Sequence, residues 1–315
     1  MSSATLATDT TVRRVIAASA FPVVMTAAVV IAHYAYINRY DVVAATGVIV
    51  VGSGFIIGVL ERFFPHHESW LHSNGDLRVD MFYAPIISIA SGIAASAVLV
   101  LGFVLASVAS ARYGAELWPT SWPMVFQVAL ALAIAEFPKY WHHRLQHETD
   151  FLWRFHATHH SAPRLYFLNA ARFHPVDTYI DGICGLLPLI ALGAGVEVLM
   201  MFTVISAVHG FFQHANIPIR IGPLNYVFSM AELHRWHHSR TVDEANRNYG
   251  QNIILWDLVF GTFYWPSDRE PPEQIGLANL AAFPMGLFGQ LASPFTWGRI
   301  KKNSGTTEPQ SATGV

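Results

Sequence analysis

The chain has little cysteine and little charge. Its one cysteine, Cys184, excludes a disulfide framework within the chain and a cysteine-rich zinc or iron–sulfur site. Charged residues make up 13% of the 315 residues, whereas soluble globular domains have about 25%. With a formal net charge of -2, the sequence gives no reason to expect nucleic acid as a partner. Since hydrophobic residues reach 53% and the mean hydropathy is +0.35, we expect a bilayer to surround much of the chain.

Two kinds of sequence signal are also missing. The apolar stretch after Arg13 and Arg14 shows no convincing cleavage site, so we interpret it as a retained membrane anchor and not as a secretory signal peptide. No GxGxxG segment opens a β-α-β unit, which argues against flavin or nicotinamide binding within the chain.

Long apolar runs, in contrast, are abundant. About 20 helical residues cross ~30 Å of hydrocarbon. Four stretches reach or approach this length: Val15–Ile37, Val42–Leu60, Pro85–Val108 and Trp122–Phe137. A fifth, Ile183–Val208, is interrupted at Gly193-Ala-Gly195, so it forms either one span or a hairpin that enters and returns.

The distribution of basic residues predicts which side of the membrane each segment occupies. Arg13 and Arg14 place the N-terminus in the cytoplasm, and Lys139 and Arg144 bring the chain back there after the fourth span. We therefore expect an all-α integral membrane protein with about four transmembrane helices, a re-entrant hairpin and a cytosolic, histidine-rich helical cap.

Histidine is the residue in excess. The chain has 16 histidines, and 12 of them lie between His142 and His238. Eight form three boxes: His143-Arg-Leu-Gln-His147, His156-Ala-Thr-His159-His160 and His234-Arg-Trp-His237-His238. Residues i, i+3 and i+4 share a helix face, so each box directs two or three imidazoles to one side. Eight imidazoles exceed what one tetrahedral zinc ion binds and suit two metal ions. The boxes can share a site only on one side of the membrane, which favours the hairpin for the fifth stretch.

The three boxes resemble the HxxxH, HxxHH and HxxHH pattern of the fatty acid hydroxylase/sterol desaturase superfamily, which are integral-membrane di-iron oxygenases. Other segments also resemble family elements: Arg172-Phe-His-Pro-Val-Asp177, Gln213-His-Ala-Asn-Ile217, Asn248-Tyr-Gly250 and Trp256-Asp257. The resemblance covers about Glu136 to Pro266.

This resemblance implies a set of metal ligands. The family's box ligands carry over onto His143, His147, His156, His159, His160, His234, His237 and His238. We add His214 as a ninth ligand and His209 as a tenth, and His174 as a further ligand or an outer residue. Asp177, Asn216 and Asp257 are candidates to orient imidazole N–H groups, which most metal-bound histidines require. No catalytic residue is assigned apart from these ligands.

By the same resemblance, the cofactors are two iron ions and O2 is a co-substrate. The expected reaction is hydroxylation of a C–H bond in a fatty acyl, sterol or related lipid. Electrons come from an external donor such as cytochrome b5 or ferredoxin with its reductase. Desaturation of the C-5 sterol type is the alternative, because both reactions use the same ligands. A membrane metal-binding or metal-transport protein is an alternative of another class; transporters place their ligands within the spans, whereas these boxes lie beyond the span ends.

The expected domain organisation follows from these segments. Residues 1–14 form an N-terminal tail, and residues 15–135 form transmembrane helices. Residues 136–266 form the catalytic region, with a membrane hairpin at about 183–208, and residues 267–315 form an interfacial segment and a disordered tail. We expect a multi-pass protein of the bacterial cytoplasmic membrane, or alternatively of the endoplasmic reticulum, with the active site on the cytoplasmic side.

Overall fold

The fold is helical, as the sequence predicts. The structure is a computed structural model that describes residues 3–113 and 117–305. Within these ranges there is no β-strand, and only two isolated bridges pair Phe228 with Ile253 and Ser239 with Ile275. A disordered tail is predicted at the C-terminus. Most of it lies outside the described residues, which end at residue 305, just after α12 (Trp297–Ser304).

Three long helices contain the first three predicted spans. They are α1 (Ser3–Ile37), α2 (Val42–Phe63) and α3 (Asp76–Tyr113). At 1.5 Å per residue, about 20 residues of each suffice to cross a bilayer. Large apolar side chains such as Val43, Phe55 and Phe103 are exposed on their outer faces, which suits contact with lipid. Because α1 begins at Ser3, most of the segment predicted as an N-terminal tail is helical.

The fourth apolar helix differs from the prediction. Among the described residues, four helices are long and apolar enough to cross a membrane, and the fourth of these is α7 (Val196–His214). The stretch predicted as the fourth span lies instead in α4 (Met124–Glu148). Buried Gln127, Glu136 and Lys139 interrupt the apolar character of α4 and bond to neighbouring segments, whereas Val125 and Phe126 on the same helix are exposed.

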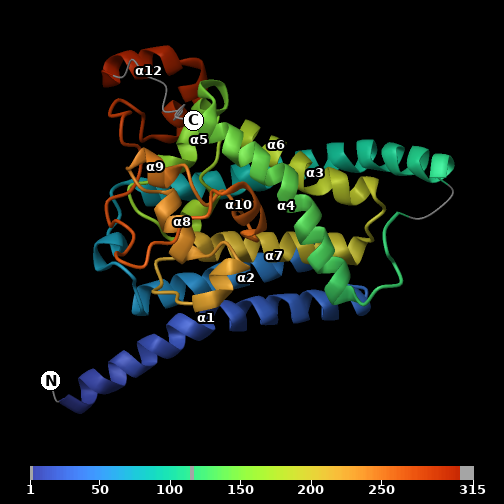
Figure 1. Cartoon of the computed structure of the whole chain (residues 1–315), viewed down its shortest axis with the longest axis horizontal. Coiled ribbons are helices and arrows are strands. Elements are labelled where there is room, and N and C mark those ends of the chain that lie inside the picture. Colours follow the sequence, from blue (N-terminus) through green and yellow to red (C-terminus); the bar gives the residue numbers. More distant parts are fainter. Residues whose placement is uncertain (1–2, 114–116, 306–315) are drawn as a thin grey trace.

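The fifth apolar stretch is a helical hairpin. Helix α6 (Pro175–Ala191) and helix α7 are joined by a turn at the glycine-rich break, where Gly193 adopts φ +88°. Next to this turn, Glu197 Oε1 lies 2.6 Å from Nδ1 of His33, near the end of α1. The turn therefore lies at the end of the bundle where α1 meets α2 and α3 meets α4 (Figure 1). This is the geometry that the hairpin alternative requires, whereas its insertion into a bilayer stays a prediction.

Helices α6 and α7 form the centre of the bundle. Helix α3 packs along α6, α1 and α2 pack along α7, and α4 lies against both. Apolar cores fill these contacts on either side of α7. The short helices gather at the opposite end of the bundle and form a cap (Figure 1). The short α-helices there are α5 (Asp150–His160), α8 (Ala231–His237), α9 (Val242–Ala245), α10 (Leu255–Phe260), α11 (Leu287–Ala292) and α12. Four 3-10 turns complete this part: Glu68–Leu71, Phe167–Ala171, Gly222–Tyr226 and Ser293–Phe295.

Candidate metal centre

Nine buried histidines meet where the bundle joins the cap. They form two groups, and within each group one ligand atom per residue lies within 4.8 Å of all the others. The first group contains His143, His147, His156, His160 and His237; the second contains His159, His214, His234 and His238. None of the nine is more than 4% exposed. The groups adjoin, because the rings of His160 and His238 stack with centroids 4.4 Å apart.

Helix geometry explains how the residues are divided. Each i, i+4 pair stays in one group: His143 with His147, His156 with His160, and His234 with His238. The remaining residue of the second and third boxes points to the other group, so α5 and α8 each serve both groups. Helix α4 supplies only the first group and the C-terminal residue of α7 only the second.

Oxygen acceptors hold the outer nitrogens of six of the nine rings. His143 Nδ1 lies 2.7 Å from the carbonyl oxygen of Tyr249, and His237 Nδ1 lies 2.8 Å from that of Arg247. A carbonyl oxygen only accepts, so in both rings Nδ1 carries the hydrogen and Nε2 keeps its lone pair. Side-chain and backbone oxygens hold four further rings in the same way, at 2.8–3.3 Å: Asp177 for His156, Asn246 for His147, Asn169 for His214 and Arg172 O for His159.

The inner nitrogens face one another. The Nε2–Nε2 distance is 3.1 Å for His143 with His156, for His214 with His234 and for His234 with His238. Two nitrogens bound at right angles to one ion, each ~2.1 Å from it, are about 3 Å apart. The Nε2 atoms of His147, His160 and His237 are buried and have no hydrogen-bond partner among the described residues.

The protonation of these rings suits metal binding. Burial lowers the pKa of His143 to about 4, although the hydrogen bond to Tyr249 opposes this. Burial, reinforced by the neighbouring imidazoles, holds the pKa of His160 and His237 well below the usual value. The rings are therefore neutral near pH 7, and neutral imidazole is the form that ligates. Facing lone pairs without hydrogens between them fit a bound cation, so the residues present fit the metal pair that the boxes imply.

His209 lies outside both groups. It is five residues before His214 on α7, and at 100° per residue this rotates it about 140° away from His214. Its ring contacts Phe21 edge-on, with centroids 5.6 Å apart, within the apolar contact between α1 and α7. The expectation that His209 is a tenth ligand therefore has no support from its position.

The four outer candidates have different positions. Asp177 Oδ2 lies 2.9 Å from His156 Nδ1, while its other oxygen accepts from Gln146 at 2.6 Å. His174 caps α6, since its Nδ1 accepts from the N–H of Val176, and it belongs to neither group.

Asn216 and Asp257 do not contact an imidazole. Asn216 forms two hydrogen bonds with the backbone of His67. Asp257 accepts from the backbone N–H groups of Tyr249 and Gly250 at 2.8 and 2.7 Å. Asp257 therefore supports the site indirectly, because it fixes the segment whose Tyr249 carbonyl accepts from His143.

Sequence reasoning missed three side chains that hold the site. Asn169, Asn246 and Gln146 contact His214, His147 and Asp177 respectively. Only Gln146 had a usable signal, because it lies inside the first box, one turn after His143 and on the side that faces α6.

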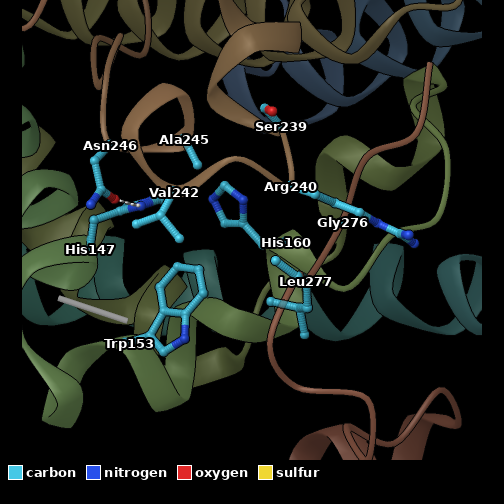
Figure 2. A pocket seen from close by; sticks show the side chains of 11 residues that line it. His147, Trp153, His160, Ser239, Arg240, Val242, Ala245, Asn246, Gly276 and Leu277 are labelled. Carbon is cyan, nitrogen blue, oxygen red and sulfur yellow. Dashed lines mark hydrogen bonds between the residues drawn. The ribbon is translucent and has the colours of Figure 1, made fainter. Parts of the chain in front are cut away.

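A small opening leads from the surface of the cap to the first group. Figure 2 shows His147 and His160 on its wall, with Trp153 beside them and Asn246 bonded to His147. Its volume is about 30 Å³, which is room for about one water molecule. An opening of this size admits very small molecules to His147 and His160.

Comparisons with known proteins point to one family. A family model described as fatty acid hydroxylase matches residues 128–262, the region that contains both histidine groups. Ornithine lipid hydroxylase OlsE of Rhizobium tropici is 39% identical over 251 residues, which are 79% of this chain and 75% of that protein.

Two other relatives match over shorter regions. Alkylglycerol monooxygenase of Homo sapiens is 30% identical over 128 residues, 41% of this chain and 28% of that protein. Methylsterol monooxygenase 1 of Rattus norvegicus is 28% identical over 142 residues, 44% of this chain and 47% of that protein. No solved structure matches the chain.

Proposed function

The chain belongs to the fatty acid hydroxylase family, and on this basis we infer that it is a membrane-bound oxidoreductase that hydroxylates a C–H bond of a lipid with O2. The family expected from the histidine boxes is thus confirmed. The three relatives named above are hydroxylases or monooxygenases, which favours hydroxylation over the desaturase alternative. The same names give no support to a metal transporter.

The observation that carries the proposal is the pair of adjoining imidazole groups with their Nε2 atoms turned inward. We propose that the first group holds one iron ion and the second group holds another. Two bound iron ions supply the activation of O2 that an unreactive C–H bond requires. Iron is preferred to zinc here because zinc has no redox chemistry.

The residues of the chain would prepare this site in three ways. The Nδ1 acceptors fix six of the nine rings in the tautomer that leaves Nε2 free to bind a metal. Burial excludes bulk water from both groups and so limits side reactions. The carboxylate of Asp177 keeps His156 oriented and makes it a stronger ligand.

We propose an aminolipid as the first substrate to test, because a relative that matches 79% of this chain is named an ornithine lipid hydroxylase. Sterols and fatty acyl chains stay alternatives. The electron donor is proposed to be an external carrier such as ferredoxin or cytochrome b5 with its reductase. Each hydroxylation needs two electrons and two protons, and the second oxygen atom leaves as water.

We also propose a multi-pass arrangement in a bacterial cytoplasmic membrane, with the metal groups on the cytoplasmic side. Four apolar helices support a membrane location. The basic pair Arg13 and Arg14 near the start of α1 favours a cytoplasmic N-terminus. The turn between α6 and α7 lies at the opposite end of the bundle from α5 and α8, which supports placing all three boxes on one side (Figure 1). Residues 136–266 are proposed as the catalytic region.

The proposal is tested by comparing lipids from cells with and without the gene, by mass spectrometry. A lipid that gains one oxygen atom only when the chain is present supports the hydroxylase. A lipid that loses two hydrogen atoms makes the chain a desaturase. Unchanged lipids in cells that contain the iron-loaded protein and a competent donor contradict both.

A further inference from the structure

A second cavity lies behind the metal groups. Its volume is about 570 Å³, it is open on one side, and it is bounded mainly by α8 and by residues 265–271. Helix α8 turns its histidines toward the metal groups, and Arg235 and Trp236 point the other way, into the cavity wall. The cavity therefore shares one helix with the metal site but is separate from it.

The charges around this cavity balance. Its lining has the arginines Arg220, Arg235 and Arg269 and the carboxylates Glu232, Asp268 and Glu270. Arg220 is at the rim with its side chain 55% exposed, and it bonds to Glu270 at 2.7 Å. A balanced set of opposite charges suits a zwitterion better than a ligand with one charge.

The buried arginine is incompletely satisfied. Arg235 is 2% exposed, and its Nη2 donates to the backbone oxygens of Ala215 and Ile217 at 2.9 and 2.6 Å. Its Nε has no hydrogen-bond partner within the part of the chain that the structure describes. Because this guanidinium is buried, Arg235 adds positive charge to the cavity wall without presenting a free donor to a ligand.

Aromatic rings provide the complementary surface. Trp236 and Trp265 line the cavity together with Tyr226, whose ring centroid is 5.9 Å from that of Trp265. The ring faces of tryptophan and tyrosine attract ammonium groups. Arg269 already occupies one such position, 4.9 Å over the ring of Trp236.

The cavity lies beside the start of a candidate membrane span. The backbone N–H of Arg220 donates to the carbonyl of Ala17, in the first turns of the candidate span Thr11–Ile37. On the same rim, Leu224 and Tyr226 expose 48% and 54% of their surface. Exposed apolar and aromatic residues next to arginines are typical of the membrane–water interface.

We propose that this cavity binds the zwitterionic headgroup of a membrane lipid. The phosphate or carboxylate of the lipid lies against Arg220, in the field of the buried charge of Arg235, and its ammonium group lies against Glu270 and the ring of Trp265. The acyl chains leave over the apolar rim. The binding site does not depend on the hydroxylation chemistry of the other face of α8.

The test measures binding directly. The purified, metal-loaded full chain is titrated in detergent with dihexanoyl phosphatidylethanolamine, and bound lipid is counted by native mass spectrometry. Arg220→Ala and Trp265→Ala should each weaken binding about tenfold, which is about 1.4 kcal/mol. Arg62→Ala is the matched control, since Arg62 is also an exposed arginine but lies outside the cavity, and it should bind normally.

Two further probes identify the ligand chemistry. Glu270→Gln should weaken binding of the phosphatidylethanolamine but not of dihexanoyl phosphatidylglycerol, which has no ammonium group. Equal affinity of the wild-type chain for both lipids would overturn the proposal, as would unchanged binding by Arg220→Ala and Trp265→Ala. Displacement of the lipid by an equal concentration of inorganic phosphate would show that the cavity binds anions in general, and it would also overturn the proposal. Because no turnover is measured, an inactive but lipid-binding protein would contradict only the hydroxylase assignment.

Discussion

His143 and His156 approach each other through their Nε2 atoms at 3.1 Å, and each has its Nδ1 against an oxygen, Tyr249 O in one case and the Asp177 carboxylate in the other. With a hydrogen on each Nδ1, two lone pairs face one another across this gap. In water-free surroundings such a contact is repulsive unless a cation lies beside it. The account of this chain as a metal enzyme depends on that contact and on its counterparts in the second group.

His159→Ala should abolish activity and lower the metal content. His159 belongs to the second group and is 2% exposed. Its loss removes one imidazole ligand, and the buried space that it leaves holds no other side chain that could bind the metal. Metal analysis and lipid mass spectrometry on membrane-inserted protein check this prediction. His142→Ala is the control: His142 is also buried but belongs to neither group, so metal content should stay near normal. An equal loss of metal in both variants would show that burial, and not ligation, explains the effect.

Asp177→Asn should weaken metal binding by about 10–100-fold, because the carboxylate that orients His156 is replaced by a neutral amide. The measurement is the metal retained after dialysis against increasing concentrations of a chelator. Asp243→Asn changes an exposed carboxylate outside the site and should retain metal as the wild type does. If Asp177→Asn keeps its metal as well as the control, the carboxylate does not support the ligand.

Gly250→Ala should destabilise the protein by about 1–3 kcal/mol, because an added methyl group forces the surroundings to move. A Cβ at this position would be 2.6 Å from the carbonyl oxygen of Ile253 and 3.1 Å from an oxygen of Asp257. The displaced segment includes the Tyr249 carbonyl that holds His143, so metal content should fall as well. Thermal unfolding in detergent measures the change. Gly52→Ala, where a Cβ meets nothing within 4 Å, should unfold like the wild type.

Removal of the metal should lower the unfolding temperature. Without the metal, nine buried imidazoles stay out of water and have no ion to bind. A metal that binds only the folded state stabilises that state, so its removal lowers the free energy of unfolding. A thermal scan before and after chelation, and again after addition of ferrous iron, gives the comparison. An unfolding temperature that does not respond to either step would mean that the two groups bind no metal.

Much of the site could be predicted because it depends on local helix geometry. The boxes pair residues at i and i+4, and those pairs fall in the same group. The break at Gly193-Ala-Gly195 likewise marked the turn between α6 and α7. In both cases neighbours in sequence determine the result.

The rest depends on contacts between distant segments. His143 is held by Tyr249, 106 residues away, through a backbone carbonyl that any residue could supply. His214 is held by Asn169 from a 3-10 turn with no periodic pattern. Helix α4 is long and apolar enough in sequence to be read as a span. Its buried Glu136 and Lys139 bond to Asn252 and Asp181, and these partners cannot be identified from the sequence of α4.

The most direct measurement is the iron content of the purified full chain. The two adjoining groups predict about two iron ions per chain, falling well below that in His159→Ala and staying near two in His142→Ala. A single zinc ion per chain, or no metal after purification with ferrous iron present, would contradict the account of this protein as a di-iron oxygenase.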